Sequence, residues 1–502
     1  SEAVPVTRGA GLLLHPTSLP SRFGAGDLGP EAASFLDWAA RAGQSVWQVL
    51  PLGPTGMGNS PYGCLSAFAG NPLLVSPELC RDEGLLGEDD LARAESPGGD
   101  RVDFAAAAGS RERQLRHAFT AFRESPSESL SRAFAEFREA PEQATWLRDW
   151  ALFAALKAGH GGRAWTDWDP ELRDRRPGAL AAAERRLGEE LEYHRFVQFL
   201  FFRQWSALRD RTRAAGVELL GDLPIYVAAD SADVWAHREL FELDGASQPL
   251  RVAGVPPDYF SATGQLWGNP LYRWDRLRES GYAWWIERLR ANLRLTDRVR
   301  LDHFRGFAGF WAVPAGEATA EGGTWVEGPG AELFEAIAAA LGGLPLVAED
   351  LGVITPDVTA LRDRFGLPGM KVLQFGFDPG SDHAPHRLVP HSVVYTGTHD
   401  NDTTRGWFES LDEGARRRVL LYTGGTPETI SWDLLRTAYT AVAELAIAPV
   451  QDLLGLDGSA RMNRPGSDAG NWGWRLAPGS LGGDLAERLA ELVAVAGRLP
   501  PG

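Results

Sequence analysis

Arg300-Leu301-Asp302-His303-Phe304-Arg305 is the stretch on which the fold prediction rests. It ends an apolar run that includes Val299, and such a run is typical of a buried β-strand that gives way to a loop. Ala348-Glu349-Asp350-Leu351-Gly352 and Gly397-Thr398-His399-Asp400-Asn401-Asp402 have the same form. Each places a carboxylate at the end of a predicted strand, which is where (β/α)8 barrels carry catalytic groups. The three stretches therefore predict a parallel barrel with acids gathered at one end.

Short apolar, β-branched runs recur along the chain and alternate with helical patterns, as expected for βαβ units around a parallel sheet. We predict eight strands, the number that a closed (β/α)8 TIM barrel of the α/β class requires. Asp222 is expected at the end of the third. The predicted strands cover residues 11–15, 45–50, 216–220, 298–301, 344–348, 370–375, 392–395 and 445–449.

The uneven spacing of these strands predicts two insertions within a single catalytic barrel unit, 1–502. The first, 56–213, follows the second strand and is expected to be largely helical from about residue 111. The second, 228–281, is rich in Pro, Gly, Asp and aromatic residues and is expected to be a loop insertion at the active site, because loops of this length are usually functional. Helices within the first insertion are predicted at 112–122, 130–137, 146–156 and 187–213.

Composition narrows the classes of partner. The net charge of −17 argues against nucleic acid or an anionic membrane surface, because both would repel the chain. No apolar run approaches the roughly 18 to 20 residues of a membrane span, and residues 1–9 lack a signal pattern. Cys64 and Cys80 are too few for a disulfide framework or a zinc site, which favours a cytoplasmic location over a bridge between them.

Asp302 and Glu349 are the predicted pair for glycosidic-bond chemistry, in which one carboxylate attacks the anomeric carbon and one carboxyl protonates the leaving oxygen. With retention, these groups lie about 5 Å apart, and neighbouring strands are about 4.8 Å apart. Arg300 shares a strand face with Asp302 and is expected to lower its pKa and keep it ionised. Glu349 needs a pKa raised by burial and a nearby negative charge, so it is the predicted proton donor.

Asp400 is predicted to hold sugar hydroxyls and to stabilise the oxocarbenium-like charge, with His303 and His399 as hydroxyl ligands. The alternative for each acid is a helix N-cap, and we prefer that kind of structural role for Asp350 only. Catalysis is favoured for the other acids because three of them follow separate strands beside His or Arg residues.

Sugar binding also requires flat apolar surfaces. Trp267, Tyr259, Phe260 and Tyr62 lie in or beside predicted loops, and a turn at 59–63 is expected to present the Tyr62 hydroxyl. Core positions are expected for the side chains of Trp47, Trp150, Trp205 and His15. Metal binding is not favoured at His383, His386 and His391, because their spacing brings no carboxylate or Cys partner.

The stretches at 300–307, 348–352 and 396–403 resemble the signature segments of the amylomaltases, the 4-α-glucanotransferases of glycoside hydrolase family 77 in the α-amylase clan. The resemblance implies a barrel with insertions and without a C-terminal β-sandwich domain, and only about fifty residues follow the eighth predicted strand. It extends over nearly the whole chain, through residues 15–20, 60–62, 221–227, 255–260, 265–270 and 461–466.

By this resemblance, Asp302 is the nucleophile, Glu349 the general acid/base and Asp400 the transition-state stabiliser. Substrate-binding positions are implied in the cleavage subsite, along the cleft and in the loop above it. They are Ser60, Tyr62, Asp222, Asp258, Tyr259, Trp267, Arg300, His303, Phe375 and His399.

The implied activity is retaining transfer of α-1,4-glucan segments from malto-oligosaccharide, starch or glycogen to the 4-hydroxyl of a glucan or glucose, with cyclic glucans as a further product. No cofactor or metal is expected, and a monomer is favoured. Three alternatives remain open: an α-amylase-type hydrolase with the same acids, a glucan-binding protein without activity, and a barrel enzyme whose acids hold a divalent metal.

Overall fold

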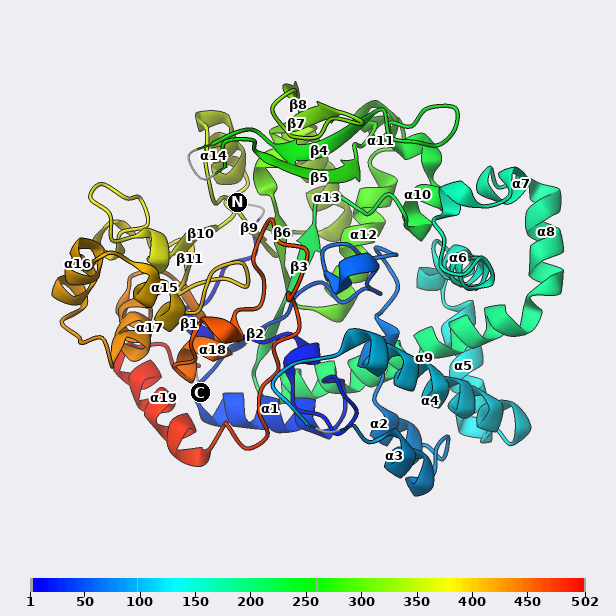
Figure 1. Cartoon of the computed structure of the whole chain (residues 1–502), viewed down its shortest axis with the longest axis horizontal. Helices are drawn as coiled ribbons and strands as arrows, with labels where there is room; N and C mark the ends of the chain where they lie inside the picture. Colours follow the sequence, from blue (N-terminus) through cyan, green and yellow to red (C-terminus); the bar gives the residue numbers. More distant parts are fainter. Residues whose placement is uncertain (1–2, 97, 259–260, 501–502) are drawn as a thin grey trace.

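The computed structural model describes residues 3–96, 98–258 and 261–500. At its centre is a closed barrel of eight parallel strands in the spatial order β1-β12-β11-β10-β9-β6-β3-β2, which confirms the predicted (β/α)8 fold (Figure 1). Every predicted strand has a counterpart. Their bounds are β1 Gly9–Leu13, β2 Val46–Gln48, β3 Glu218–Pro224, β6 Arg298–Asp302, β9 Leu346–Ala348, β10 Gly369–Val372, β11 Ser392–Tyr395 and β12 Leu445–Pro449.

One strand boundary matters for the site. β3 continues past its predicted end at residue 220, so that Asp222 lies within the strand and pairs with Arg300 of β6. An acid is tolerated at this fully buried position because its carboxylate faces the Arg300 guanidinium. The length of β3 therefore depends on a buried ion pair and not on apolar residues alone.

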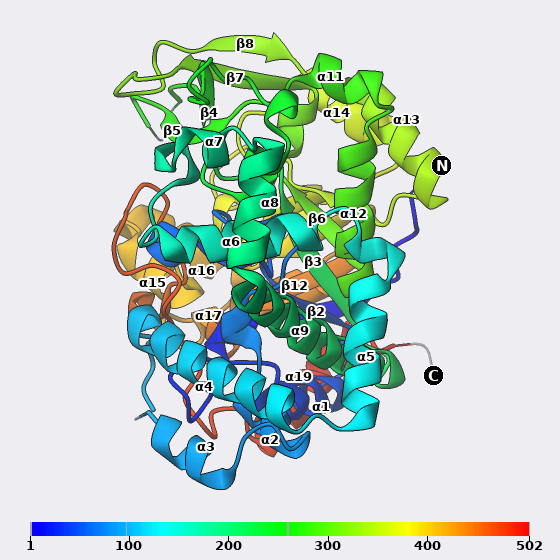
Figure 2. The same cartoon turned by 90° about the vertical axis from the view of Figure 1, so that its right-hand side faces the viewer.

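Helices surround the barrel and fill the first insertion (Figures 1 and 2). Those outside this insertion are α1 Pro30–Arg41, α10 Ala232–Ala236, α11 Trp274–Glu279, α12 Ala283–Leu295, α13 Gly330–Leu341, α14 Pro356–Arg364, α15 Thr404–Ser410, α16 Glu413–Thr423, α17 Ile430–Thr440, α18 Val450–Leu453 and α19 Gly483–Val495. Among the described residues, no helix has both the length and the apolar character needed to cross a membrane.

The insertion between β2 and β3 is helical, as predicted. Its long helix α9 packs aromatic side chains against its neighbours, for example Phe196 against Phe122 with ring centroids 4.7 Å apart. The four predicted helices correspond to α4, α5, α6 and α9, whereas the shorter helices α2, α3, α7 and α8 were not predicted because they bury few apolar residues. The helices are α2 Pro77–Asp82, α3 Glu88–Ala94, α4 Phe104–Glu124, α5 Glu128–Glu139, α6 Leu147–Gly159, α7 Pro170–Arg173, α8 Pro177–Arg186 and α9 Gly188–Ala214.

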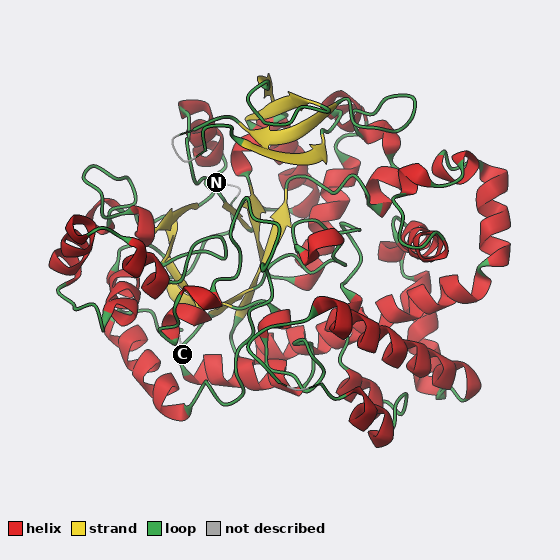
Figure 3. Cartoon of the chain, viewed as in Figure 1, coloured by secondary structure: helices red, strands yellow, loops and turns green. Residues whose placement is uncertain are grey.

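A second sheet lies beside the barrel, and the sequence did not predict it (Figure 3). It is antiparallel, in the order β5-β4-β7-β8, and two of its strands lie in the segment 228–281 that was expected to be a loop. Local periodicity is weak there because most of β5 is exposed and because β4 pairs with a strand that follows β6. The strands are β4 Arg251–Val255, β5 Gln265–Pro270, β7 Gly309–Pro314 and β8 Thr324–Glu327.

Candidate active site

The three predicted catalytic acids lie at the carboxyl ends of the barrel strands. Asp302 is the last residue of β6 and Glu349 directly follows β9, and these strands are paired through Leu301 and Ala348. Asp400 lies in the loop after β11. All three acids line one cleft with a volume of about 1760 Å³. The fold thus brings the predicted acids to a single cleft that is large enough for an extended ligand.

Arg300 joins the buried Asp222 to the half-buried Asp302. Its Nη1 donates to both carboxylate oxygens of Asp222, at 2.9 and 3.0 Å, and lies 3.1 Å from Oδ1 of Asp302. Burial alone would lower the pKa of Arg300, but Asp222 and Asp302 raise it well above its usual value. The guanidinium therefore stays charged and holds both carboxylates on the same side of the barrel.

The pKa values of the two predicted reacting acids are both raised. Burial raises the pKa of Asp302 to about 6, even though Arg300 lowers it. The expectation that Arg300 gives Asp302 a low pKa is therefore wrong in its net direction, because the loss of water outweighs the nearby positive charge. Burial raises the pKa of Glu349 to about 7, and the charge of Asp302 adds to this effect. Glu349 remains the weaker acid of the pair, as a proton donor must be.

Glu349 is held by backbone groups. Its Oε2 accepts a hydrogen bond from the amide N–H of His303 at 2.7 Å, and its Oε1 accepts one from Leu351 at 2.8 Å. His303 has a φ of 54°, a left-handed conformation that turns the chain sharply after Asp302. Gly306 allows the next turn to pack closely, since a Cβ there would lie 2.9 Å from the His303 ring. The side chain of Glu349 is thus fixed by the shape of two loops.

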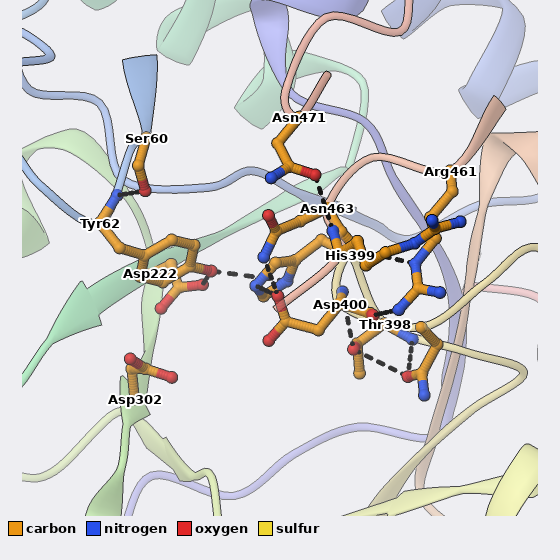
Figure 4. A network of polar contacts seen from close by, with 12 residues as sticks. Ser60, Tyr62, Asp222, Asp302, Thr398, His399, Asp400, Arg461, Asn463 and Asn471 are labelled. Carbon is orange, nitrogen blue, oxygen red and sulfur yellow. Dashed lines mark hydrogen bonds and ion pairs between the residues drawn. The ribbon is translucent and has the colours of Figure 1, made fainter. Parts of the chain in front are cut away.

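A second group of polar contacts runs from Tyr62 and Asp222 to His399 and Asp400 (Figure 4). The Tyr62 hydroxyl donates to Oδ2 of Asp222 at 2.5 Å, and its ring stacks on His399 with centroids 4.9 Å apart. His399 Nε2 lies 3.3 Å from Oδ1 of Asp400, and the same oxygen accepts a hydrogen bond from Asn463 Nδ2 at 2.7 Å. Burial lowers the pKa of His399, so its neutral ring is suited to hydrogen bonding with hydroxyl groups.

Asn463 and Arg461 were not predicted as site residues. Arg461 Nη2 donates to the carbonyl of Asp400 at 2.6 Å, and its Nε donates to the carbonyl of Asn463 at 2.8 Å. The segment 461–466 was noticed only for its resemblance to the family, because nothing local in it indicates that it folds back over the end of β11. Its dense run of Arg, Asn, Pro and Gly was the one available signal.

The aromatic candidates lie on the walls of the cleft. Trp267 on β5 is 38% exposed and meets the His303 ring edge-on, with centroids 4.7 Å apart. Phe375 is 42% exposed. The structure brings almost all predicted substrate-binding residues to this cleft. Asp222 does not line it, because its carboxylate is buried against the Tyr62 hydroxyl. Tyr259 and Phe260 fall outside the described residues. The predicted residues that line the cleft are Ser60, Tyr62, Asp258, Trp267, Arg300, His303, Phe375 and His399.

Several residues have the structural positions that were expected. Asp350 accepts a hydrogen bond from the amide of Met370 and pairs with Arg362, and His15 is buried and accepts the amide N–H of Leu50. Trp47, Trp150 and Trp205 are buried, and Cys64 and Cys80 are both free. His383, His386 and His391 each contact a different partner, and no cluster of metal-ligating side chains occurs among the described residues.

A closed parallel barrel with acids at the ends of its strands, together with a large cleft lined by aromatic residues, is the arrangement typical of the glycoside hydrolase class. The sequence pattern of glycoside hydrolase family 77, described as 4-alpha-glucanotransferase, matches residues 14–480, and the chain belongs to this family. Its enzymatic activity is therefore that of a 4-α-glucanotransferase, which confirms the resemblance.

Individual relatives support this assignment. The chain is 52% identical to a 4-alpha-glucanotransferase of Synechocystis sp., with 98% of each chain covered. It is 51% identical to one of Thermus thermophilus, covering 98% of this chain and 99% of the relative. The solved structure of the amylomaltase from Streptococcus agalactiae in complex with acarbose has a TM-score of 0.95 at 38% identity, covering 98% of this chain and all of that one.

Proposed function

We propose that the enzyme transfers α-1,4-glucan segments with retention, from malto-oligosaccharide or starch to the 4-hydroxyl of a glucan or glucose, through a covalent glycosyl-Asp302 intermediate. The observation that carries this proposal is the placement of Asp302 and Glu349 at the ends of the paired strands β6 and β9. Equivalent positions on neighbouring strands suit the roughly 5 Å separation of retaining enzymes. The acarbose complex of the Streptococcus agalactiae amylomaltase supports α-glucans as ligands.

In the first step, an oxygen of Asp302 attacks C1 of the donor sugar and the bond from C1 to the leaving O4 breaks. Glu349 gives its proton to O4, and the leaving glucan departs. In the second step, the acceptor 4-hydroxyl attacks C1, Glu349 takes the hydroxyl proton, and the bond to Asp302 breaks. Both acids return to their starting protonation states.

The remaining polar groups hold the sugar during these steps. Asp400 shares its Oδ1 with Asn463 and His399, which leaves its second oxygen for a sugar hydroxyl. We place its negative charge beside the anomeric centre, where it would stabilise the positive charge that develops there by several kcal/mol, on the order of 3, once the bound glucan excludes water. Arg300 holds Asp302 in place through the attack.

Transfer requires that the acceptor compete with water. A millimolar acceptor faces water at roughly 55 M, so its advantage must be about 10⁴- to 10⁵-fold, or some 6 kcal/mol. We assign this discrimination to the cover of the cleft, which includes Trp267 on β5 and the loop 461–472. Cyclic glucans would form by the same steps when the acceptor hydroxyl belongs to the bound chain itself.

Incubation with maltotriose tests the proposal. Transfer yields glucose and longer chains without a net rise in reducing ends, whereas the alternative α-amylase-type hydrolysis raises the number of reducing ends. Glu349→Gln is expected to lose activity and to keep its fold, which argues against a binding protein without activity. Asp378→Asn is the matched control, because Asp378 also lines the cleft but pairs with Arg418 at the surface. Net hydrolysis would refute the assignment to transfer.

A further inference from the structure

An aromatic pair lies on the antiparallel sheet beside the catalytic acids. Trp311 on β7 and Trp325 on β8 are register partners, and their rings meet edge-on with centroids 5.2 Å apart. Trp325 is 48% exposed, and both side chains line the same cleft as Asp302. The sheet therefore presents an open indole surface to the cleft at a position that the reaction steps above do not use.

The pair is held firmly in place. The indole N–H of Trp311 donates to the carbonyl of Ala320 at 2.8 Å. Gly323 leaves room for the ring, since a Cβ there would lie 2.2 Å from Trp311 Nε1. Exposing a large indole forgoes burial energy of roughly 2 kcal/mol. An exposed Trp325 ring packed against a fixed, half-buried Trp311 in a cleft is typical of a binding surface.

Polar groups beside the pair complete the features of a sugar site. The Arg305 guanidinium lies over the Trp325 ring, 4.2 Å from its centroid, and its Nη1 donates to the carbonyl of Val353 at 2.9 Å. Glu327, two residues after Trp325, is exposed and also lines the cleft. An aromatic face can contact sugar CH groups, while a planar donor and a carboxylate bind hydroxyls. The combination fits a neutral, hydroxyl-rich ligand.

The position of this surface indicates which sugar it would contact. Arg305 follows Asp302 by three residues, and Trp267 stands against the intervening His303. Trp267 and Trp325 lie on the two edge strands of the antiparallel sheet, β5 and β8, so a glucan bound beside Trp267 must extend across the sheet to reach Trp325. We propose that Trp311, Trp325 and Arg305 form an outlying subsite that binds a glucose unit of an α-1,4-glucan remote from the bond being broken. The inference rests on the proposed function, because it assumes that substrate class.

The subsite predicts a dependence on chain length. Long chains reach it and gain affinity, whereas maltotriose ends before it. In the full-length enzyme, Trp325→Ala is expected to raise the KM for maltoheptaose relative to that for maltotriose by about 3- to 10-fold, the range expected for one aromatic contact. Trp325→Phe keeps a ring and should restore most of this ratio.

Arg488→Ala is the matched control. The guanidinium carbon of Arg488 lies 3.7 Å from the centroid of the Trp432 ring, so these residues also form an arginine and tryptophan pair. Neither of them is among the described residues that line the cleft. This variant should keep the wild-type ratio. Circular dichroism and the melting temperature show whether each variant is folded, and Trp325→Leu replaces Trp325→Ala if the latter is not.

Calorimetric binding gives a second measurement without turnover. In a Glu349→Gln background, Trp325→Ala should weaken the binding of maltoheptaose by the same 3- to 10-fold. The affinity for maltotriose should stay within a factor of about 2 of its value without the Trp325 substitution. If a folded variant lost affinity equally for both substrates, or for neither, the proposed subsite would be overturned. If the wild-type enzyme does not disproportionate maltotriose, the proposed function fails instead, so the two failures are distinguishable.

Discussion

The floor and the rim of the cleft differ in what they hold. The floor consists of barrel strand ends, where the buried Arg300 lies within 3.1 Å of both Asp222 and Asp302. The rim is the antiparallel sheet, where Trp267 and Trp325 are more than one third exposed. The floor buries charged groups and the rim exposes apolar surface. Both arrangements lower the stability of the folded protein, and both lie where the ligand is expected to bind.

This difference suggests that the floor and the rim affect different stages of the reaction. Buried charges act on bond making and breaking, because electrostatic effects are strong where water is excluded. Exposed rings act on binding, because stacking on a sugar changes affinity and not the barrier itself. Substitutions in the floor should therefore lower kcat, and substitutions in the rim should change KM or the choice of acceptor.

Replacing the proposed nucleophile tests the floor most severely. Asp302→Asn removes the oxygen that would attack the anomeric carbon, so kcat on maltotriose should fall by at least about 10⁴-fold. The side-chain volume is nearly unchanged, and the fold should persist. Initial rates of glucose release measure the effect, with Asp378→Asn as the control. Retention of more than a tenth of the activity would remove Asp302 from its assigned role.

Arg300→Lys should produce the next largest effect. A lysine ammonium cannot contact Asp222 and Asp302 together as the guanidinium does, so kcat should fall by about 100-fold. The Arg300 guanidinium lies 3.1 Å from Asp302 and lowers the pKa of that acid, so an ammonium that contacts Asp222 alone should lower it less, and the pKa of Asp302 should rise. The acidic limb of the pH profile of kcat/KM, expected near pH 6 in the wild type, should therefore move to higher pH. An unmoved limb would mean that Arg300 does not set the ionisation of Asp302.

The sequence was sufficient to predict the floor. Asp302, Glu349 and Asp400 could be assigned because each follows a short apolar run, and the position of a strand end is a local signal. Adjacency of β6 and β9 followed from the winding order of a parallel barrel. The net pKa of Asp302 could not be predicted, because burial depends on every loop that closes over it.

Most of the rim could not be predicted. Trp311 and Trp325 meet only because β7 and β8 pair, and isolated tryptophans in a sequence do not reveal such a pairing. Asn463 reaches Asp400 across 63 residues of chain, through a loop whose path depends on Arg461. Contacts of this kind arise from tertiary packing and have no local periodicity.

Arg461 links the floor to the loop above it, and its replacement tests how tightly the two are coupled. Arg461→Gln loses the hydrogen bonds to the carbonyls of Asp400 and Asn463, so Asp400 should be less well positioned. A loss of about 10-fold in kcat is expected, with little change in the KM for maltotriose. Arg461→Lys should recover part of it. A lower melting temperature with unchanged kcat would indicate a structural role alone.

Trp267→Ala tests the rim. The side chain stands against His303 beside the reacting centre, and its loss should admit water. The ratio of transfer to hydrolysis is expected to fall by about 3-fold, the scale of one aromatic contact. Comparing released glucose with the rise in reducing ends from maltotriose measures this ratio. An unchanged ratio would exclude Trp267 from acceptor selection.

The smallest expected effect concerns the stability cost of the floor. Burial raises the pKa of Glu349 to about 7, above its unfolded value of 4.5, so its ionised form destabilises the folded state above pH 7. As the pH falls from about 7 toward 4.5 the folded state holds a proton that the unfolded state lacks, and this penalty is progressively relieved. Glu349→Gln carries no charge at any pH. The melting temperature of the variant minus that of the wild type should therefore be more positive at pH 8 than at pH 5, by about 2 °C. The difference at a single pH also contains the changed hydrogen bonds to His303 and Leu351, whereas the change with pH isolates the charge. A difference that did not vary with pH would mean that the floor does not bury a destabilising carboxylate at this position.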